Sequence, residues 1–216
     1  MIISVLNPKG GSGKTSLAIQ LASWLHSEGH NTVLIDTDPQ GSARDWQAVA
    51  SSKGRESVPV MGVDRADGIR QLPGLVKPYA FAVLDGTGKQ ERSVGEALRV
   101  SDAVLIPVKP SGVDVWAVSE LVEIIKTRQA VADRPWAGFV ISQAVSRTKL
   151  KTELTETLGE LDLPILESAM TLRQVYAQSL TEGVSVFDTD NAAAKAEVSR
   201  IGAELLRRTG KMEQAA

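Results

Sequence analysis

Residues 9–15 read Lys9-Gly10-Gly11-Ser12-Gly13-Lys14-Thr15, and this stretch decides the fold that we expect. An apolar run at residues 2–6 precedes it, and a helical pattern at residues 16–27 follows. A strand, a glycine-rich turn and a helix in this order form a phosphate cradle, because backbone N–H groups and the positive end of the helix dipole converge on an anion. A chance glycine–lysine turn on a surface would lack this context. The stretch therefore predicts a nucleotide-binding loop.

The polar residues of this loop have separate expected roles. Lys14 can reach the β- and γ-phosphates, and the Thr15 hydroxyl can bind Mg²⁺. Pro8 stands where the general loop pattern has a glycine, and Lys9 adds a second cation that would be crowded at a single triphosphate. We therefore expect Lys9 to have a task of its own. The residues expected to bind the nucleotide are Gly10, Gly11, Ser12, Gly13, Lys14, Thr15 and Ser16.

Length and composition are those of one α/β domain. The chain has 216 residues, a net charge of −2 and no cysteine, which excludes disulfides, iron–sulfur ligation and thiol catalysis. The net charge gives no global attraction to nucleic acid. We find no apolar run of membrane-spanning length and no signal peptide, so the expected location is cytoplasmic, with nucleoid association as an option. Residues 1–209 are expected to form the domain and residues 210–216 a frayed tail.

Apolar runs alternate with helical patterns along most of the chain. Several runs are continuously apolar, as in strands that are buried on both faces of a parallel sheet. This alternation predicts a doubly wound, mostly parallel sheet flanked by helices, with its ligand at the carboxyl ends of the strands. Residues 62–78 are the least regular part, and a helix is expected within them. The expected strands are residues 2–6, 32–35, 58–63, 81–84, 103–108, 138–141 and 164–166.

Two of these strands end in aspartate, and both are expected to lie beside the loop. Residues 32–35 lead into Asp36, and residues 81–84 lead into Asp85. A carboxylate at a strand end behind such a loop typically holds Mg²⁺, and another can orient the attacking water. We assign Asp85 and Thr15 to the coordination shell of Mg²⁺. Asp36 is expected to position the attacking water and also to contribute to that shell. Asp38 could join these two acids in the site or could only shape the Asp-Pro turn, and both roles stay open.

The nucleotide base can be judged from the sequence as well. GTPases of this architecture usually carry Asn-Lys-x-Asp after a late strand, whereas residues 142–147 here read Ser-Gln-Ala-Val-Ser-Arg. ATP and ADP with Mg²⁺ are therefore the expected ligands.

The loop resembles the deviant Walker A loop of the ParA/MinD family of ATPases. Residues 36–40, Asp-Thr-Asp-Pro-Gln, resemble the second acidic motif of that family, and residues 106–111 with Asp114 resemble its third conserved segment. Residues 172–176 and 183–187 look most like the small plasmid-partition ParA proteins, of which ParF is the type. Residues 85–88, Asp-Gly-Thr-Gly, differ from the Asp-Thr-Pro-Pro of the wider family; Gly86 and Gly88 would let this loop move as a switch.

This resemblance implies an ATP-dependent sandwich dimer, with polymerisation left open. Lys9 would reach the partner's nucleotide, so that Lys9, Lys14 and Asp36 form the catalytic set. The family also implies weak turnover that a centromere-binding partner protein of ParB or ParG type stimulates, non-specific DNA binding, and plasmid or chromosome partition. We expect no helix-turn-helix before the ATPase fold and hence no specific operator binding.

Several alternatives stay open at this point. The basic residues could bind DNA or form solvated helix faces: Arg147, Lys149, Lys151, Arg173, Arg200, Arg207 and Arg208. A MinD-like positioning scaffold at a membrane or pole is the alternative function, and a metabolic P-loop enzyme is a third. The apolar face of the helix expected at residues 191–208 carries no Phe or Trp, so we expect it to pack against the domain rather than on a membrane.

Overall fold

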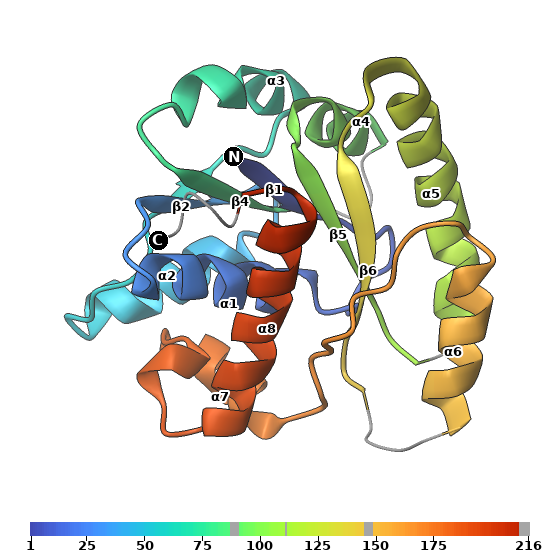
Figure 1. Cartoon of the computed structure of the whole chain (residues 1–216). Coiled ribbons are helices and arrows are strands. Elements are labelled where there is room, and N and C mark those ends of the chain that lie inside the picture. Colours follow the sequence, from blue (N-terminus) through green and yellow to red (C-terminus); the bar gives the residue numbers. More distant parts are fainter. Residues whose placement is uncertain (87–90, 111, 145–148, 212–216) are drawn as a thin grey trace.

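The computed structural model describes residues 1–86, 91–110, 112–144 and 149–211, with the backbone alone for 112–117 and 149–153. Its centre is a six-stranded sheet in the order β3-β2-β4-β1-β5-β6, in which all neighbouring strands are parallel (Figure 1). The fold class predicted from the sequence is confirmed. The strands are β1 (Ile2–Val5), β2 (Thr32–Asp36), β3 (Val60–Gly62), β4 (Phe81–Asp85), β5 (Ala103–Val108) and β6 (Trp136–Ile141).

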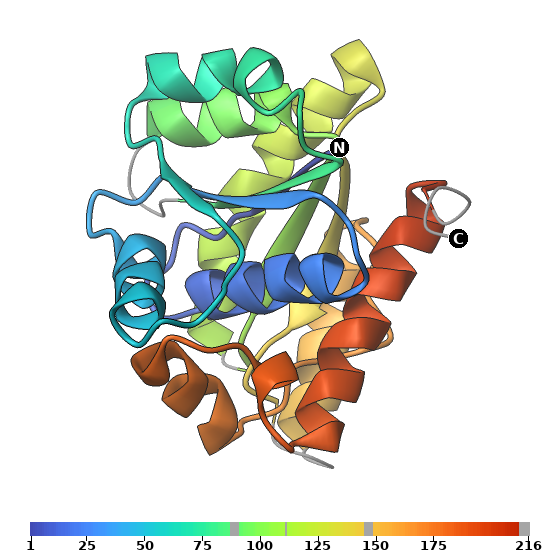
Figure 2. The same ribbon diagram turned by 90° about the vertical axis from the view of Figure 1, so that its left-hand side faces the viewer.

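Helices cover both faces of the sheet, as the two perpendicular views show (Figures 1 and 2). One face carries α1 (Lys14–Ser27), α2 (Ser42–Ser52), α7 (Gln174–Glu182), the short 3₁₀ helix η1 (Val186–Asp188) and α8 (Ala192–Arg208). The other face carries α3 (Ala66–Leu75), α4 (Glu91–Val100), α5 (Gly112–Ala132) and α6 (Lys149–Gly159). A sheet enclosed in this way needs strands that are apolar on both sides.

The strands supply that double-sided apolar surface by alternation. In β1, Ile3 and Val5 point into the core beneath α1 and α8, whereas Ile2 points into the core beneath α3 to α6. All three side chains are buried. Because successive side chains in a strand point to opposite faces, a continuous apolar run fills two cores at once.

One expectation about local structure was wrong. Residues 164–166 form no seventh strand: Ile165 makes one isolated bridge to Phe139 on β6. The segment follows the edge of β6, and Pro164 has no N–H to extend a ladder. The helix expected within the less regular residues 62–78 is present as α3, which includes Pro73 within its span.

The apolar face of α8 packs against the domain, as the sequence predicted. Val198, Ile201 and Leu205 are fully buried in the core that α1 shares. Gly202 lets the two helices approach, because a Cβ there would collide with the Trp24 ring on α1. No helix within the described ranges is long and apolar enough to cross a membrane.

Candidate nucleotide-binding site

The glycine-rich loop lies between the end of β1 and the start of α1, as predicted. Gly11 and Gly13 have φ angles of 70° and 95°, in the left-handed region that glycine adopts most readily. Asn7 fixes the start of the loop: its Nδ2 donates to the Pro107 carbonyl at 2.7 Å, and its Oδ1 accepts from the Lys9 N–H at 2.8 Å. The loop geometry is therefore held by side-chain contacts as well as by its glycines.

Lys14 is buried at the first turn of α1 and folds back over the loop. Its Nζ donates to the carbonyl oxygen of Lys9 at 3.0 Å. Burial lowers the pKa of Lys14, and the charges of Asp85 and Asp38 oppose that change. A carbonyl is a weaker partner for an ammonium than an anionic oxygen is, so a phosphate group would be favoured in its place.

The two predicted aspartates lie on neighbouring strands at the same edge of the sheet. β2 pairs with β4 so that Asp36 and Asp85 are register partners. Thr37 ties the two strand ends together, since its Oγ1 donates to the Asp85 carbonyl at 2.7 Å. The structure thus brings Lys14, Asp36 and Asp85 together, as the sequence predicted.

Asp85 is a buried carboxylate without a conventional partner. Both of its oxygens lack a hydrogen bond of standard geometry among the described residues. Burial raises the pKa of Asp85 to about 7; the nearby Thr15 hydroxyl opposes this rise, Asp36 adds to it, and Lys14 opposes it. Buried carboxylates are normally paired or coordinate a metal. Thr15 and Asp85 offer the hard oxygen donors that Mg²⁺ takes when substrate phosphates complete its shell.

Asp36 and Asp38 have different surroundings. Asp36 is fully buried, and its Oδ1 accepts the Asp38 N–H at 3.1 Å while its Oδ2 accepts the Arg44 N–H at 3.1 Å. Asp38 Oδ1 accepts the Gln40 N–H at 3.0 Å, a hydrogen bond within the turn that follows β2.

The loop is also supported by side chains to which the sequence assigned no role. Ser142 Oγ donates to the Ser12 carbonyl at 2.6 Å, and Gln143 Nε2 lies 3.4 Å from the Gly11 carbonyl. Lys109 also reaches the loop, since a Cβ on Gly11 would lie 3.6 Å from its Nζ. In the sequence, residues 106–111 bear only on the family resemblance, and residues 142–147 bear only on the choice of nucleotide base. The signal that could have found these side chains is their place directly after β5 and β6.

A cavity of about 260 Å³ opens beside the loop and offers room for a base. Its lining is mainly apolar, and it begins at Gly13 and Ser16 of the cradle. A planar aromatic group could be held there without a charged partner. The other lining residues are Ser142, Gln143, Met170, Thr171, Leu172, Arg173, Tyr176, Ala177 and Leu180.

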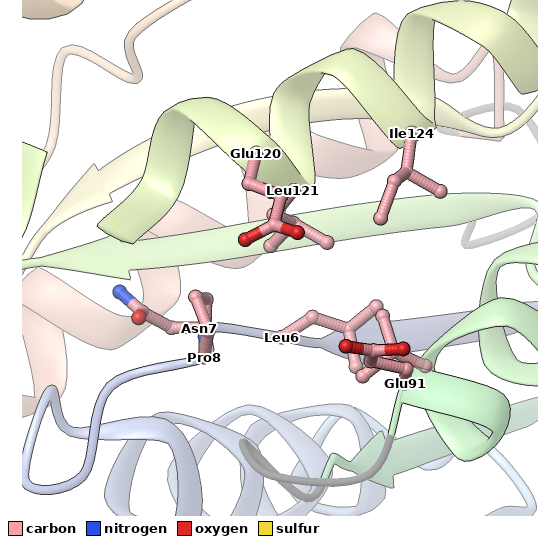
Figure 3. Close-up of a pocket in the computed structure, with 8 residues that line it drawn as sticks. Leu6, Asn7, Pro8, Glu91, Glu120, Leu121 and Ile124 are labelled. Atoms are coloured by element: carbon pink, nitrogen blue, oxygen red, sulfur yellow. The ribbon is translucent and has the colours of Figure 1, made fainter. Parts of the chain in front are cut away.

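A second hollow of about 210 Å³ lies next to the start of the loop, between β1, α4 and α5 (Figure 3). Asn7 and Pro8 form one side of it, and Glu91 and Glu120 place carboxylates toward it (Figure 3). Two carboxylates without a lining cation would repel a triphosphate. We therefore place the nucleotide at the cradle and not in this hollow.

The basic residues named for DNA contact have different environments. Arg173 donates to Glu197 at 2.8 Å and Arg208 to Glu204 at 2.9 Å, so these two guanidinium groups, each on a side chain that is 34% exposed, are paired with buried carboxylates of the same chain. Arg200 and Arg207 are exposed on α8. Arg147 and the side chains of Lys149 and Lys151 lie outside the described residues, as do Gly88 and the side chain of Asp114.

Comparison with known proteins agrees with this geometry. Residues 3–186 match the model of the CobQ/CobB/MinD/ParA nucleotide binding domain. The chain is 31% identical over 186 residues to "Maintenance of carboxysome distribution protein A" of Halothiobacillus neapolitanus, covering 86% of each chain. It is 26% identical over 179 residues to "Protein ParA" of Rhizobium radiobacter, covering 82% of this chain and 80% of that one.

A solved structure with the same fold is a putative plasmid partition protein from Borrelia burgdorferi B31 bound to AMPPNP. It has a TM-score of 0.78 at 19% identity, covering 96% of this chain and 99% of that one. Since the family model matches most of the chain, and the loop, the paired aspartates and the parallel sheet agree with it, the chain belongs to the CobQ/CobB/MinD/ParA family of nucleotide-binding ATPases.

Proposed function

We propose that this protein is a ParA-type ATPase that binds Mg-ATP, dimerises around the nucleotide and hydrolyses it to position a cargo. The observation that carries this proposal is the buried carboxylate of Asp85 beside Lys14 and Thr15 in a P-loop, which has no hydrogen bond of standard geometry among the described residues. A bound Mg²⁺ would neutralise phosphate charge during the displacement. Thr15 and Asp85 are the residues that would hold it.

The remaining residues divide the work of hydrolysis. The N–H groups of residues 10–16 and the Lys14 ammonium bind the phosphates, and Asp36 orients the attacking water for in-line displacement. Removal of the principal phosphate cation by Lys14→Ala should lower ATP affinity about a hundredfold. Equilibrium binding of a fluorescent ATP analogue measures this directly. Unchanged affinity would contradict the placement of the phosphates.

Asp36 should act in turnover rather than in binding. We expect Asp36→Ala to bind ATP and dimerise while hydrolysis stops, because the water is no longer oriented. Single-turnover hydrolysis and light scattering separate these two results. Hydrolysis at the parent rate would refute the role of Asp36.

Lys9 is proposed to complete the site of the second subunit. A cation supplied by the partner neutralises phosphate charge only when two subunits meet, so ATP binding and assembly become linked equilibria. We expect Lys9→Ala to bind ATP as a monomer, whereas Lys14→Ala has the roughly hundredfold loss of ATP affinity given above. Light scattering with and without ATP tests the difference, and ATP-dependent dimers of Lys9→Ala would contradict the proposal. Polymerisation would appear as larger species.

DNA partition is the proposed cargo function, and the relatives named ParA support it. The ATP form should hold non-specific DNA in a salt-sensitive way, and a centromere-binding partner protein of ParB or ParG type should stimulate turnover. Retention on DNA-cellulose at low and high salt tests this. Retention that is the same at low and high salt would contradict binding of the ATP form to DNA.

Two other cargo classes are distinguishable. The carboxysome distribution relative supports positioning of a protein-bounded body, which would use the same ATPase cycle with a different adaptor protein. A MinD-like membrane scaffold is less well supported, because the apolar face of α8 is buried in the fold. Pelleting with liposomes in ATP, without DNA retention, would favour the membrane scaffold.

A further inference from the structure

One buried carboxylate holds three residues of the cavity beside the phosphate loop, which we call the base cavity. Glu197 on α8 accepts hydrogen bonds from the Thr171 N–H at 3.2 Å and from the Thr171 Oγ1 at 2.8 Å. Arg173 donates to it from Nε at 3.1 Å and from Nη2 at 2.8 Å, and the Tyr176 hydroxyl donates at 2.8 Å. These three donor residues line the base cavity. Glu197 is not among the described residues that line it, so it fixes one wall of the cavity from behind.

The packing of α8 sets the position of Glu197 relative to the phosphate loop. Ile201 is fully buried in the core that α1 shares. Gly202 lets α8 lie directly against the Trp24 ring of α1. Since α1 begins at Lys14 in the cradle, one packed pair of helices carries both the phosphate end of the site and the acid behind the base cavity.

The same helix carries a second buried acid with a similar set of hydrogen bonds. Glu204 is 5% exposed, as Glu197 is. It accepts hydrogen bonds from the Arg208 guanidinium at 2.9 Å and 3.0 Å and from the Glu167 N–H at 3.0 Å. Neither Glu167 nor Arg208 is among the described residues that line the base cavity. The two acids therefore share a role in docking α8, and they differ in the cavity residues that Glu197 alone of the two holds.

We propose that Glu197 is a positioning residue for the base of the nucleotide, because it fixes the cavity wall that the base meets. It acts on the base only through the three residues that it holds. A wall that is already ordered spares the entropy cost of ordering its side chains when the ligand binds. That saving is largest for a long side chain such as Arg173. The inference rests on the proposed binding of ATP, with its base in this cavity.

The first test compares two isosteric variants on α8. Glu197→Gln keeps the side-chain volume but removes the charge that holds Arg173, so the Kd of Mg-ATP should rise about tenfold. The kcat at saturating Mg-ATP should stay that of the parent, because the reacting phosphates lie at the cradle. Glu204→Gln is the matched control, which should lose stability in urea to a similar extent and keep the parent Kd. A parent-like Kd in Glu197→Gln, or an equal rise in Glu204→Gln, would overturn the inference.

A second probe separates the base from the phosphates. Mg-tripolyphosphate carries three phosphates and no base, so it should bind the parent and Glu197→Gln equally well when it competes with ATP. A parallel loss of tripolyphosphate affinity would mean that the substitution disturbs the cradle, and the inference would fail. A parent protein that binds tripolyphosphate as tightly as ATP would also refute it, because the base cavity would then contribute nothing to binding.

A double variant asks whether Glu197 acts through the wall. Arg173→Ala should itself weaken ATP binding, and its combination with Glu197→Gln should weaken binding by less than the product of the two single factors. Factors that multiply, or a parent-like Kd in Arg173→Ala, would contradict the proposal. If the parent binds and hydrolyses ATP while Glu197→Gln keeps the parent Kd, only this inference fails. If the parent does not hydrolyse ATP, the proposed function fails.

Discussion

Two buried carboxylates on the same side of the sheet have opposite environments. Glu197 on α8 is 5% exposed and accepts hydrogen bonds from Thr171, Arg173 and Tyr176. Asp85 at the end of β4 is 1% exposed and has no bond of standard geometry in the described part of the chain. Burial acts to raise the pKa of Glu197, but the donors from Arg173, Thr171 and Tyr176 outweigh it and lower that pKa. Burial dominates at Asp85 and raises its pKa to about 7.

The difference separates a structural acid from a functional one. Glu197 joins α8 to the segment before α7, and every donor that it needs comes from the protein itself. Asp85 receives no such donor from the described residues, and a bound cation is its proposed partner. A buried group that the fold does not satisfy indicates a ligand site more directly than burial alone does.

The largest effect should come from removal of the structural acid. Glu197→Ala removes the buried acceptor that Arg173, Thr171 and Tyr176 share, so the free energy of unfolding should fall by about 3 kcal/mol. Urea denaturation measures this loss. The Mg²⁺ dependence of hydrolysis below the unfolding transition should stay that of the parent, and a stable variant with an altered Mg²⁺ dependence would contradict the distinction.

Removal of the functional acid should have the reverse profile. Asp85→Ala should lower Mg²⁺-dependent hydrolysis about a hundredfold, because a residue of the metal shell is lost. Stability without nucleotide should not fall as it does in Glu197→Ala. Hydrolysis rates over a Mg²⁺ titration test this, and a parent-like Mg²⁺ dependence would exclude Asp85 from the metal shell.

Stability should depend on pH through Asp85. Its folded pKa of about 7 lies above the ordinary value of 3.8, so the folded state retains a proton that the unfolded state releases between these values. This contribution is complete below the unfolded pKa and is lost as the pH rises through 7. Without nucleotide and with EDTA, the free energy of unfolding should fall by about 2 kcal/mol between pH 5 and pH 8. Asp85→Asn should remove most of this slope; an equal slope would show that another group causes it.

The smallest effect should come from a single donor of Glu197. Tyr176→Phe deletes the hydroxyl that donates to Glu197 at 2.8 Å, while the Arg173 and Thr171 bonds remain. The expected loss of stability is about 1 kcal/mol. Thermal unfolding of Tyr176→Phe and Glu197→Ala in parallel measures this loss. If the two variants lose equal stability, the Arg173 and Thr171 hydrogen bonds contribute nothing further.

Much of the nucleotide site could be predicted from local patterns in the sequence. The loop at residues 9–15, the strand before it and the aspartates after two other strands follow from short-range rules, because parallel strands place their carboxyl ends at one edge. The one wrong strand had a local cause as well. The apolar residues 164–166 resemble a strand but only follow the edge of β6.

By itself, the sequence determined the fold class, the phosphate loop and the acidic residues around it. Only the tertiary structure decided which charges are engaged and which are left unsatisfied. Arg173 and Asp85 could both have been functional; the structure gives Arg173 to Glu197 and leaves Asp85 without a bond of standard geometry. The physical reason is distance along the chain. Asp85 lies beside Thr15, and Ser142 lies beside Ser12, only after the strands have assembled, and no local pattern records such long-range contacts.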